Sequence, residues 1–158
     1  MKKIVLILVM LVSYACSFDR ISLEYGYKDS IDVYGLSLFK DFDYKLFDIA
    51  DLSLEVTTEY VDGKNDSMAI ISTQPLATID ITENLYFEAG LGVAYFSKEH
   101  LDHKQFGMNF QFKESIGFGY RFNDNFDATL KYNHYSNANL DDDNSGLDFV
   151  GLKVAYRF

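Results

Sequence analysis

Hydrophobic and polar residues alternate along most of this chain with a period of two, which is the pattern of β-strands with two different faces. The alternation marks eight segments, at about 21–28, 31–40, 52–60, 67–80, 85–95, 110–122, 126–133 and 150–158. Several are longer than the roughly 5 to 6 residues typical of soluble domains and match the roughly 9 to 11 that a tilted strand needs to cross a bilayer. The pattern therefore predicts an all-β fold, an eight-stranded antiparallel transmembrane β-barrel.

The turns between these segments predict which end of the barrel faces outward. Turns near 41–48, 81–84 and 123–125 alternate with those near 29–30, 62–66, 97–107 and 139–146. Bacterial barrels keep short turns on the periplasmic side and longer loops outside, so we expect the last two of these loops to be extracellular and both termini to lie at the other end. A soluble exported β-sandwich would alternate in the same way, but it would rarely need such long strands.

The first 17 residues have a different composition from the rest of the chain. A basic start, an apolar run and then small residues are typical of a secretory signal peptide, cleaved after Ala15 or Ser17. Residues 18–158 are then one outer-membrane barrel domain. Cys16 raises a lipidated N-terminus as an alternative, although the residues before it fit a lipoprotein signal poorly. It is the one cysteine of the chain, so no intramolecular disulfide can form.

Charge and the C-terminus narrow the range of partners. A formal net charge of −10 would repel a polyanion, so no nucleic acid is expected as a partner. The chain ends in KVAYRF, an alternating strand closed by Phe158, and this ending resembles the signal that the barrel assembly machinery recognises. Together with the strand pattern it predicts a multi-pass β-barrel in a bacterial outer membrane, and it leaves open whether the barrel forms a homodimer.

Charged residues on the polar face of the strands predict a filled lumen. A small barrel has room inside for side chains, and these need partners of opposite charge. The residues expected in this network are Lys113, Arg121, Lys131, Lys153 and Arg157, with Glu88 and Asp127.

One stretch, YNHYSNANLDDDNSGLD at 132–148, breaks the alternation. Counting by twos along the last two strands puts His134, Ser136 and Asp148 on the apolar face, and Glu114 interrupts the apolar face of an earlier strand. An ionisable side chain that faces lipid costs about 2 to 4 kcal/mol at the midplane in the worst cases and much less near the interface. Four polar residues on this face therefore require an explanation.

The expected strand register brings these four residues together. A turn symmetric about 123–125 pairs His134 with Glu114, and a hairpin loop centred on the DDD run pairs Ser136 with Asp148. Directly opposed residues on one face lie about 4.5 to 5.5 Å apart at Cβ. The patch would lie about 20 Å above the periplasmic turns on a strand tilted by about 45°, which is the height of the outer leaflet.

A serine, a histidine and an acid are the components of a hydrolase. Ser136 would be the nucleophile, His134 the base that takes its proton, and Asp148 the acid that orients the imidazole. On the residues alone, a second interpretation stays open. Polar side chains near a strand end can simply reach toward head groups and loops.

At these residues the chain resembles the outer-membrane lipid A 3-O-deacylases, the PagL family of eight-stranded barrels. HYSNA at 134–138 resembles the family's His-x-Ser-Asn-Ala motif, and NSGLD at 144–148 resembles its Asn-x-Gly-x-acid element. FKES at 112–115 stands where the family has a Phe-x-acid pair. The first hundred residues match only in strand layout.

The resemblance implies roles for six residues. Ser136, His134 and Asp148 would be catalytic, Asn137 would help form the oxyanion site, and Phe112 and Glu114 would support them. The family usually has glutamate where Asp148 stands and commonly aspartate where Glu114 stands. The implied reaction is hydrolysis of the ester-linked acyl chain at position 3 of lipid A in lipopolysaccharide, which releases a hydroxy fatty acid without a cofactor or metal.

Two other functions compete with this one. A non-enzymatic structural or adhesin-type barrel would act through the loops at 97–107 and 139–146, and a phospholipid hydrolase would use the same triad on another lipid. The KEHLDH loop contains His100 and His103, but their spacing fits no specific zinc template, so no metal site is predicted. The DDDN run is typical of a solvated loop.

Overall fold

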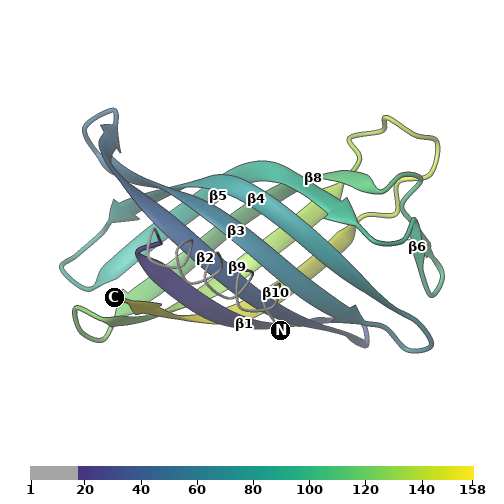
Figure 1. Cartoon of the computed structure of the whole chain (residues 1–158), viewed down its shortest axis with the longest axis horizontal. Helices are drawn as coiled ribbons and strands as arrows, with labels where there is room; N and C mark the ends of the chain where they lie inside the picture. The colour runs from purple at the N-terminus through teal and green to yellow at the C-terminus, as the bar shows by residue number, and fades with distance from the viewer. Residues whose placement is uncertain (1–17) are drawn as a thin grey trace, which may run out of the picture.

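The computed structural model describes residues 18–158, and eight strands in this range close into an antiparallel barrel (Figure 1). The strands are β1 (Arg20–Lys28), β2 (Ile31–Leu46), β3 (Ala50–Asp62), β4 (Ser67–Asp80), β5 (Leu85–Phe96), β8 (Phe110–Arg121), β9 (Phe126–Ser136) and β10 (Leu147–Arg157). Each strand pairs with the next one along the chain, and β1 closes the barrel on β10. The predicted fold is confirmed. The predicted signal peptide, its cleavage site and Cys16 lie outside the described residues.

Tight turns set the register of the first strands. The turns Asp29–Ser30 and Phe47–Asp48 have φ values between 52° and 66° at all four residues. Two successive left-handed residues form the type I′ turn, whose twist suits a β-hairpin. β2 extends to Leu46, beyond the expected end near residue 40, because the strand continues past a register shift between Asp41 and Lys45.

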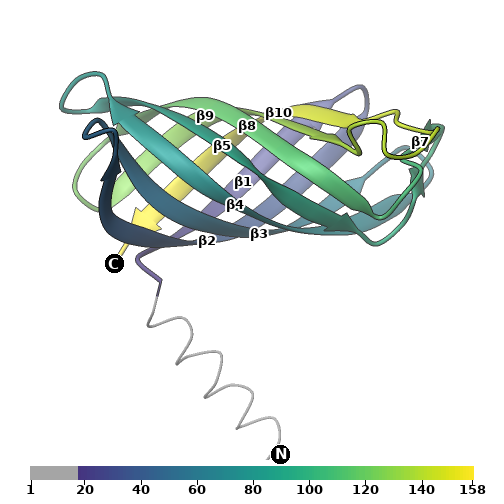
Figure 2. The same cartoon turned by 90° about the horizontal axis from the view of Figure 1, so that it is seen from above.

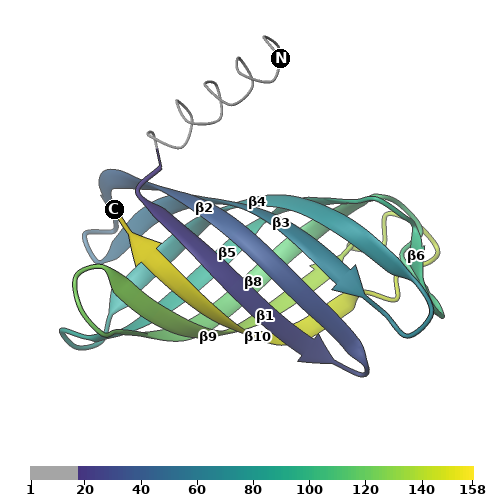
Figure 3. The same cartoon turned by 60° about the horizontal axis from the view of Figure 1, so that its bottom comes forward.

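The two ends of the barrel are built differently. The C-terminus and the turns after β2, β4 and β8 lie at one end, and the 29–30 turn, the 63–66 turn and the long 97–109 and 137–146 connections lie at the other (Figure 1 and Figure 3). The first of these connections contains β6 (His100–Leu101) and β7 (Lys104–Gln105), which pair as a small hairpin beside the loop before β10 (Figure 2). The predicted grouping of the turns is confirmed, and we call the end with the long loops the extracellular end, as the rule for bacterial barrels predicts.

The outer face of the barrel is apolar. Large side chains such as Leu23, Ile71, Leu91, Phe118 and Leu130 are exposed on it, from strands all around the barrel. Such a band suits contact with lipid, whereas on a soluble protein it would be an unusually large apolar patch. Within residues 18–158 no helix is long and apolar enough to cross a membrane.

Buried charges fill the middle of the lumen. Lys131 Nζ donates to both carboxylate oxygens of Glu55, at 3.1 and 2.9 Å, and lies 3.9 Å from Glu88 Oε1. Lys153 donates to Glu88 Oε1 at 2.6 Å, and the side chain of Lys113 is equally buried. Buried charges are tolerated only when they are paired and hydrogen-bonded, so this layer specifies which residues face inward.

The predicted lumen network is therefore correct for its three lysines and Glu88, whereas Arg121, Arg157 and Asp127 line a separate pocket. Arg121 and Arg157 lie at the end of the barrel near the C-terminus and pair with Asp80 and Asp41. Both are closer to solvent than the lysines because they are the last residues of their strands.

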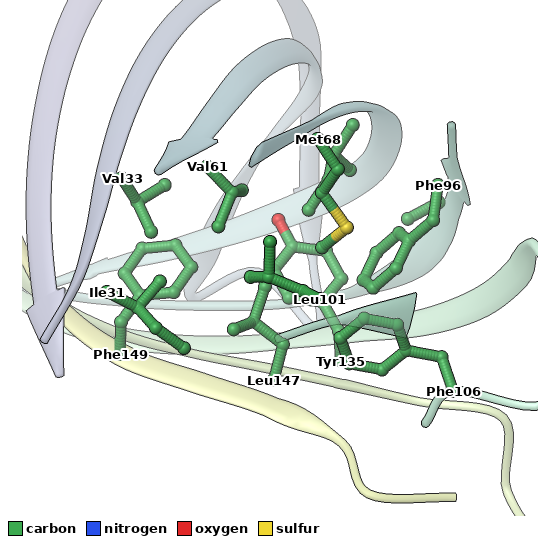
Figure 4. Close-up of a cluster of buried hydrophobic side chains, with 12 residues drawn as sticks. Ile31, Val33, Val61, Met68, Phe96, Leu101, Phe106, Tyr135, Leu147 and Phe149 are labelled. Atoms are coloured by element: carbon green, nitrogen blue, oxygen red, sulfur yellow. The ribbon is translucent and has the colours of Figure 1, made fainter. Parts of the chain in front are cut away.

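Apolar side chains close the extracellular end of the lumen (Figure 4). The cluster consists of Ile31, Val33, Val61, Met68, Ile70, Ala94, Phe96, Leu101, Phe106, Tyr135, Leu147 and Phe149, and we call it the apolar plug. Phe96 packs edge-on against Phe106 and Tyr135, with ring centroids 5.0 and 5.5 Å apart. Leu101 and Phe106 come from the 97–109 connection, so this loop is anchored in the barrel mouth.

Asp102 ties the 97–109 connection to the turn between β3 and β4. Its carboxylate accepts the backbone N–H of Lys64 at 2.7 Å and that of Asn65 at 2.8 Å. These backbone hydrogen bonds, that from Asn65 above all, hold the pKa of Asp102 below its ordinary value. A lowered pKa in the folded state means that ionisation of Asp102 stabilises the folded state. The contribution of this contact to stability is therefore fully present above the ordinary carboxyl pKa of about 4 and is lost as the pH falls through the lowered pKa.

We expect Lys131→Met to destabilise the barrel by about 3 to 5 kcal/mol, because it leaves Glu55 as a buried charge without its partner. Lys45→Met removes an exposed pair with Asp51 and should cost less than about 1 kcal/mol. Urea unfolding of the purified barrel in detergent, followed by tyrosine fluorescence, measures both. Equal losses in the two variants would contradict the role given to the buried charges.

We expect the amides of Lys64 and Asn65 to lose protection from hydrogen exchange as the pH falls below about 4 and through the lowered pKa of Asp102. Asp102→Ala should remove that protection at every pH, and Glu99→Ala, an exposed acid in the same loop, should leave it intact. Exchange rates normalised to those of the unfolded chain test this. Protection that persists in Asp102→Ala would refute it.

Candidate active site on the outer face

The predicted patch forms on the outer face next to the extracellular loops. In the β-ladder His134 lies between Glu114 on β8 and Asp148 on β10, and Ser136 lies opposite Phe112. Their inward neighbours on the same strands are buried, so all five side chains point outward, as the parity predicted. His134, Ser136 and Asp148 are half-buried, whereas Glu114 is exposed.

One of the two expected pairings is wrong. Glu114 pairs with His134 as predicted, but Asp148 also pairs with His134, and Ser136 has no partner on β10. The hairpin loop is centred one residue earlier than expected, because β9 ends at Ser136 and a tight turn at Asn137–Leu140 follows it. The acid is thereby opposite the histidine and not the serine, which is the arrangement that orienting an imidazole requires.

The carboxylate of Asp148 is the centre of the polar contacts. His134 Nδ1 lies 2.5 Å from Asp148 Oδ1, and the Tyr132 hydroxyl donates to the same oxygen at 2.7 Å. The Lys28 ammonium lies 3.4 Å from Oδ2. With Nδ1 engaged by the acid, Nε2 is the ring nitrogen left to act as a base toward a neighbouring hydroxyl.

Ser136 follows His134 by two residues and shares its face of the sheet. Within residues 18–158 no hydrogen bond joins Ser136 Oγ to the imidazole. Hydrogen bonds of this kind are often long or absent without substrate and form in the complex. Both residues are on the backbone of β9, so their Cα positions are fixed relative to each other. The distance from Ser136 Oγ to Nε2 is then set by the side-chain rotamers, and a rotation of the serine about χ1 changes it.

The loop after Ser136 is strained and held from inside. Ala138 and Asn139 have φ values of 55° and 60°, and a non-glycine residue in this region costs about 1 to 2 kcal/mol. The Asn137 side chain is fully buried and donates to the carbonyls of Phe106 and Asp143, at 2.9 and 2.8 Å. These bonds hold the turn in place against the strain.

The backbone N–H of Asn137 donates to Asn144 Oδ1 at 3.0 Å. All the donors of Asn137 that the described structure engages are therefore directed to the loop and not to a site beside Ser136. The structure makes Asn137 an anchor of the loop, and its role at the oxyanion site stays a prediction.

Glu114 borders a shallow apolar groove of about 600 Å³ on the outer face. Leu91 and Ile116 line it beside Glu114, and it continues around the barrel across Pro75 and Ala77 on β4. Phe112 is half-buried, lies opposite Ser136 and packs edge-on against Phe110, with centroids 5.4 Å apart. The patch thus combines a polar centre with an apolar surface that could hold a hydrocarbon chain.

Two contacts of the site were not predicted from the sequence. Tyr132 is on the same strand and face as His134, so the sequence pattern predicts that it points outward. The pattern does not predict that its hydroxyl turns toward Asp148. Lys28 is far from Asp148 in the chain, and the closing pair of β1 and β10 is what brings the two together.

Two relatives with known names match part of the chain. The lipid A deacylase PagL of Bordetella bronchiseptica is 40% identical over 76 residues, which cover 48% of this chain and 43% of the relative. The lipid A deacylase PagL of Pseudomonas aeruginosa is 34% identical over 67 residues, which cover 42% of this chain and 39% of the relative. The matched part of the chain spans less than half the length of either relative.

Solved structures share the architecture. A crystal structure of the outer membrane enzyme PagL aligns with a TM-score of 0.77 at 24% identity and covers 88% of this chain and 99% of that one. The N-terminal β-barrel domain of Pseudomonas aeruginosa OprF aligns with a TM-score of 0.63 at 18% identity, covering 90% and 98%. At these identities the likeness establishes the barrel fold.

A family model adds what the pairwise comparisons do not, because it extends over nearly the whole barrel. The model described as lipid A 3-O-deacylase (PagL) matches residues 30–157, from the turn before β2 to the end of β10. That range includes the outward-facing histidine, serine and acids and the loop that connects their strands. This chain therefore belongs to the PagL family of lipid A 3-O-deacylases.

Proposed function

We propose that this protein is an outer-membrane esterase that removes the 3-O-linked acyl chain of lipid A. The observation that carries the proposal is the contact between His134 and Asp148 on the lipid-facing side, with Ser136 two residues further along the same face. Membership of the family and the names of its two relatives support the same activity. The roles of the three residues are part of the proposal.

In the first half of the reaction Ser136 Oγ attacks the carbonyl carbon of the ester, and its proton passes to His134 Nε2. Asp148 accepts a hydrogen bond from Nδ1 and stabilises the imidazolium that forms. The carbon–oxygen bond to the sugar then breaks, and the sugar oxygen takes the proton from Nε2. The acyl chain remains on Ser136 as an ester.

In the second half water replaces the sugar. His134 Nε2 takes a proton from water as its oxygen attacks the acyl ester, and it returns the proton to Ser136 Oγ as the acid leaves. The products are a free 3-hydroxy fatty acid and lipid A with a free 3-hydroxyl. No cofactor enters this sequence of steps.

The position of the patch explains why a triad would face lipid. Lipid A lies in the outer leaflet, and its acyl chains run alongside the barrel wall. The apolar groove beside Glu114 offers a surface for one such chain next to the polar centre. An ester at the base of the head group would then come level with His134 and Ser136.

The placement in the outer membrane and the assembly route belong to the same proposal. The apolar outer band supports membrane insertion, and the exposed ring of Phe158 supports recognition of the C-terminal strand by the barrel assembly machinery. A non-enzymatic adhesin-type barrel would need neither the His134–Asp148 contact nor an outward serine. A phospholipid hydrolase would produce lysophospholipid and leave lipid A intact.

We expect Ser136→Ala and His134→Ala to lower kcat for lipid A deacylation by about 10⁴-fold or more, because the first removes the nucleophile and the second removes the base that takes its proton. Ser67→Ala, the same change at the same end of the barrel, should leave kcat unchanged. Fatty acid release from lipid A in detergent micelles measures all three. Residual activity within tenfold of wild type in Ser136→Ala would overturn the assignment.

The two acids that flank His134 are expected to differ in effect. Asp148→Asn should lower kcat by about 10² to 10⁴-fold, since it removes the charge that stabilises the imidazolium and disturbs the tautomer. Glu114→Gln should cost less than about tenfold, because Glu114 is exposed and, among the described residues, forms no hydrogen bond or ion pair with the imidazole. The reverse order would make Glu114 the acid of the triad.

A further inference from the structure

The Asp148 carboxylate has more partners than a triad needs. Oδ1 accepts from His134 and from the Tyr132 hydroxyl, at 2.5 and 2.7 Å, and Oδ2 faces the Lys28 ammonium at 3.4 Å. The three partners come from β9 and β1, the two strands on either side of β10. The acid is therefore held from both neighbouring strands.

Tyr132 occupies the position just below the acid. It lies two residues before His134 on the same face, opposite Val150, and therefore toward the middle of the membrane-facing surface. Its side chain is exposed on the outer face while its hydroxyl reaches the carboxylate. An amphipathic side chain of this kind separates a charge from hydrocarbon and at the same time hydrogen-bonds it.

The contacts of Asp148 determine the orientation of its carboxylate. Because Asp148 is directly opposite His134, its side chain with a single methylene can reach Nδ1, and that side chain is 23% exposed. A hydrogen bond to a charged group is the stronger kind, and two donors fix the orientation that one contact would leave free.

We propose that Tyr132 and Lys28 are positioning residues that hold the Asp148 carboxylate in the orientation it needs to align His134. This rests on the proposed function of Ser136, His134 and Asp148 as a triad. Tyr132 makes the larger contribution, because its hydrogen bond to the carboxylate, at 2.7 Å, is shorter than the 3.4 Å contact of Lys28. Lys28 is 46% exposed and more distant, and acts mainly through its charge.

Tyr132→Phe keeps the ring and removes only the hydroxyl. It should lower kcat by about tenfold with KM within about twofold of wild type, the size expected for the loss of one charge-assisted hydrogen bond. Tyr120→Phe removes the hydroxyl of another tyrosine on the outer face and should change neither constant. Lys28→Gln should lower kcat by a few-fold, and by less at high salt. Lys28→Arg keeps the positive charge and should keep kcat near that of wild type.

A cycle with Asp148→Glu tests whether the hydroxyl acts through the acid. The longer side chain moves the carboxylate, so Tyr132→Phe should cost much less than tenfold in the Asp148→Glu background. An equal loss in both backgrounds, or a loss that appears in KM alone, would overturn the proposal. Unaltered heat-modifiable gel mobility of every variant shows that the barrel is folded.

The same variants should be assayed with an alkyl fluorophosphonate, which needs no lipid A. Ser136 Oγ displaces fluoride from phosphorus as His134 takes the proton, so the rate reports activation of the serine. The rate should fall about tenfold in Tyr132→Phe, and equal rates in wild type and Tyr132→Phe would contradict the positioning role. If wild type reacts and shows this difference yet leaves lipid A intact, the positioning role stands and the proposed substrate is wrong.

Discussion

The alternation of side chains across a closed sheet is the constraint on which the rest of this structure depends. Every residue of the patch has inward neighbours that are locked in place. Tyr135, between His134 and Ser136, is fully buried and donates to both oxygens of Glu59, at 2.9 and 2.7 Å. Leu147 and Phe149 flank Asp148 in the same way and belong to the apolar plug. The interior thus fixes which side chains face lipid.

Closure of the barrel supplies the second part of the site. β9 and β10 alone would bring His134 to Asp148, but Lys28 reaches the acid only because β1 pairs with β10. The 97–109 connection also contributes, since Phe106 fills the plug and its carbonyl accepts a hydrogen bond from Asn137. The position of this surface site therefore depends on the closure of the sheet and on the packing inside the lumen. Rigid elements of this kind give a catalytic group a more precise position than a free loop would.

Much of this arrangement could be predicted from the sequence, because a period of two is a strong signal over long strands. The eight strands, the grouping of turns and the outward direction of His134, Ser136 and Asp148 all follow from it. The register of the last hairpin could not be fixed in the same way. It depends on two successive left-handed residues, Ala138 and Asn139, and of these only asparagine commonly adopts that conformation, so the sequence does not mark the pair as a turn. Contacts across the closing pair of strands, such as that of Lys28, have no local signal at all.

The central claim is that this barrel removes one acyl chain from lipid A at its lipid-facing serine. The most direct test is the mass spectrum of lipid A from outer membranes of cells that express the wild-type chain, compared with Ser136→Ala. Our account predicts that wild type alone yields a lipid A species lighter by one 3-hydroxyacyl chain, with the loss at position 3. Lipid A that is unchanged in cells with folded wild-type barrel in the outer membrane would contradict it.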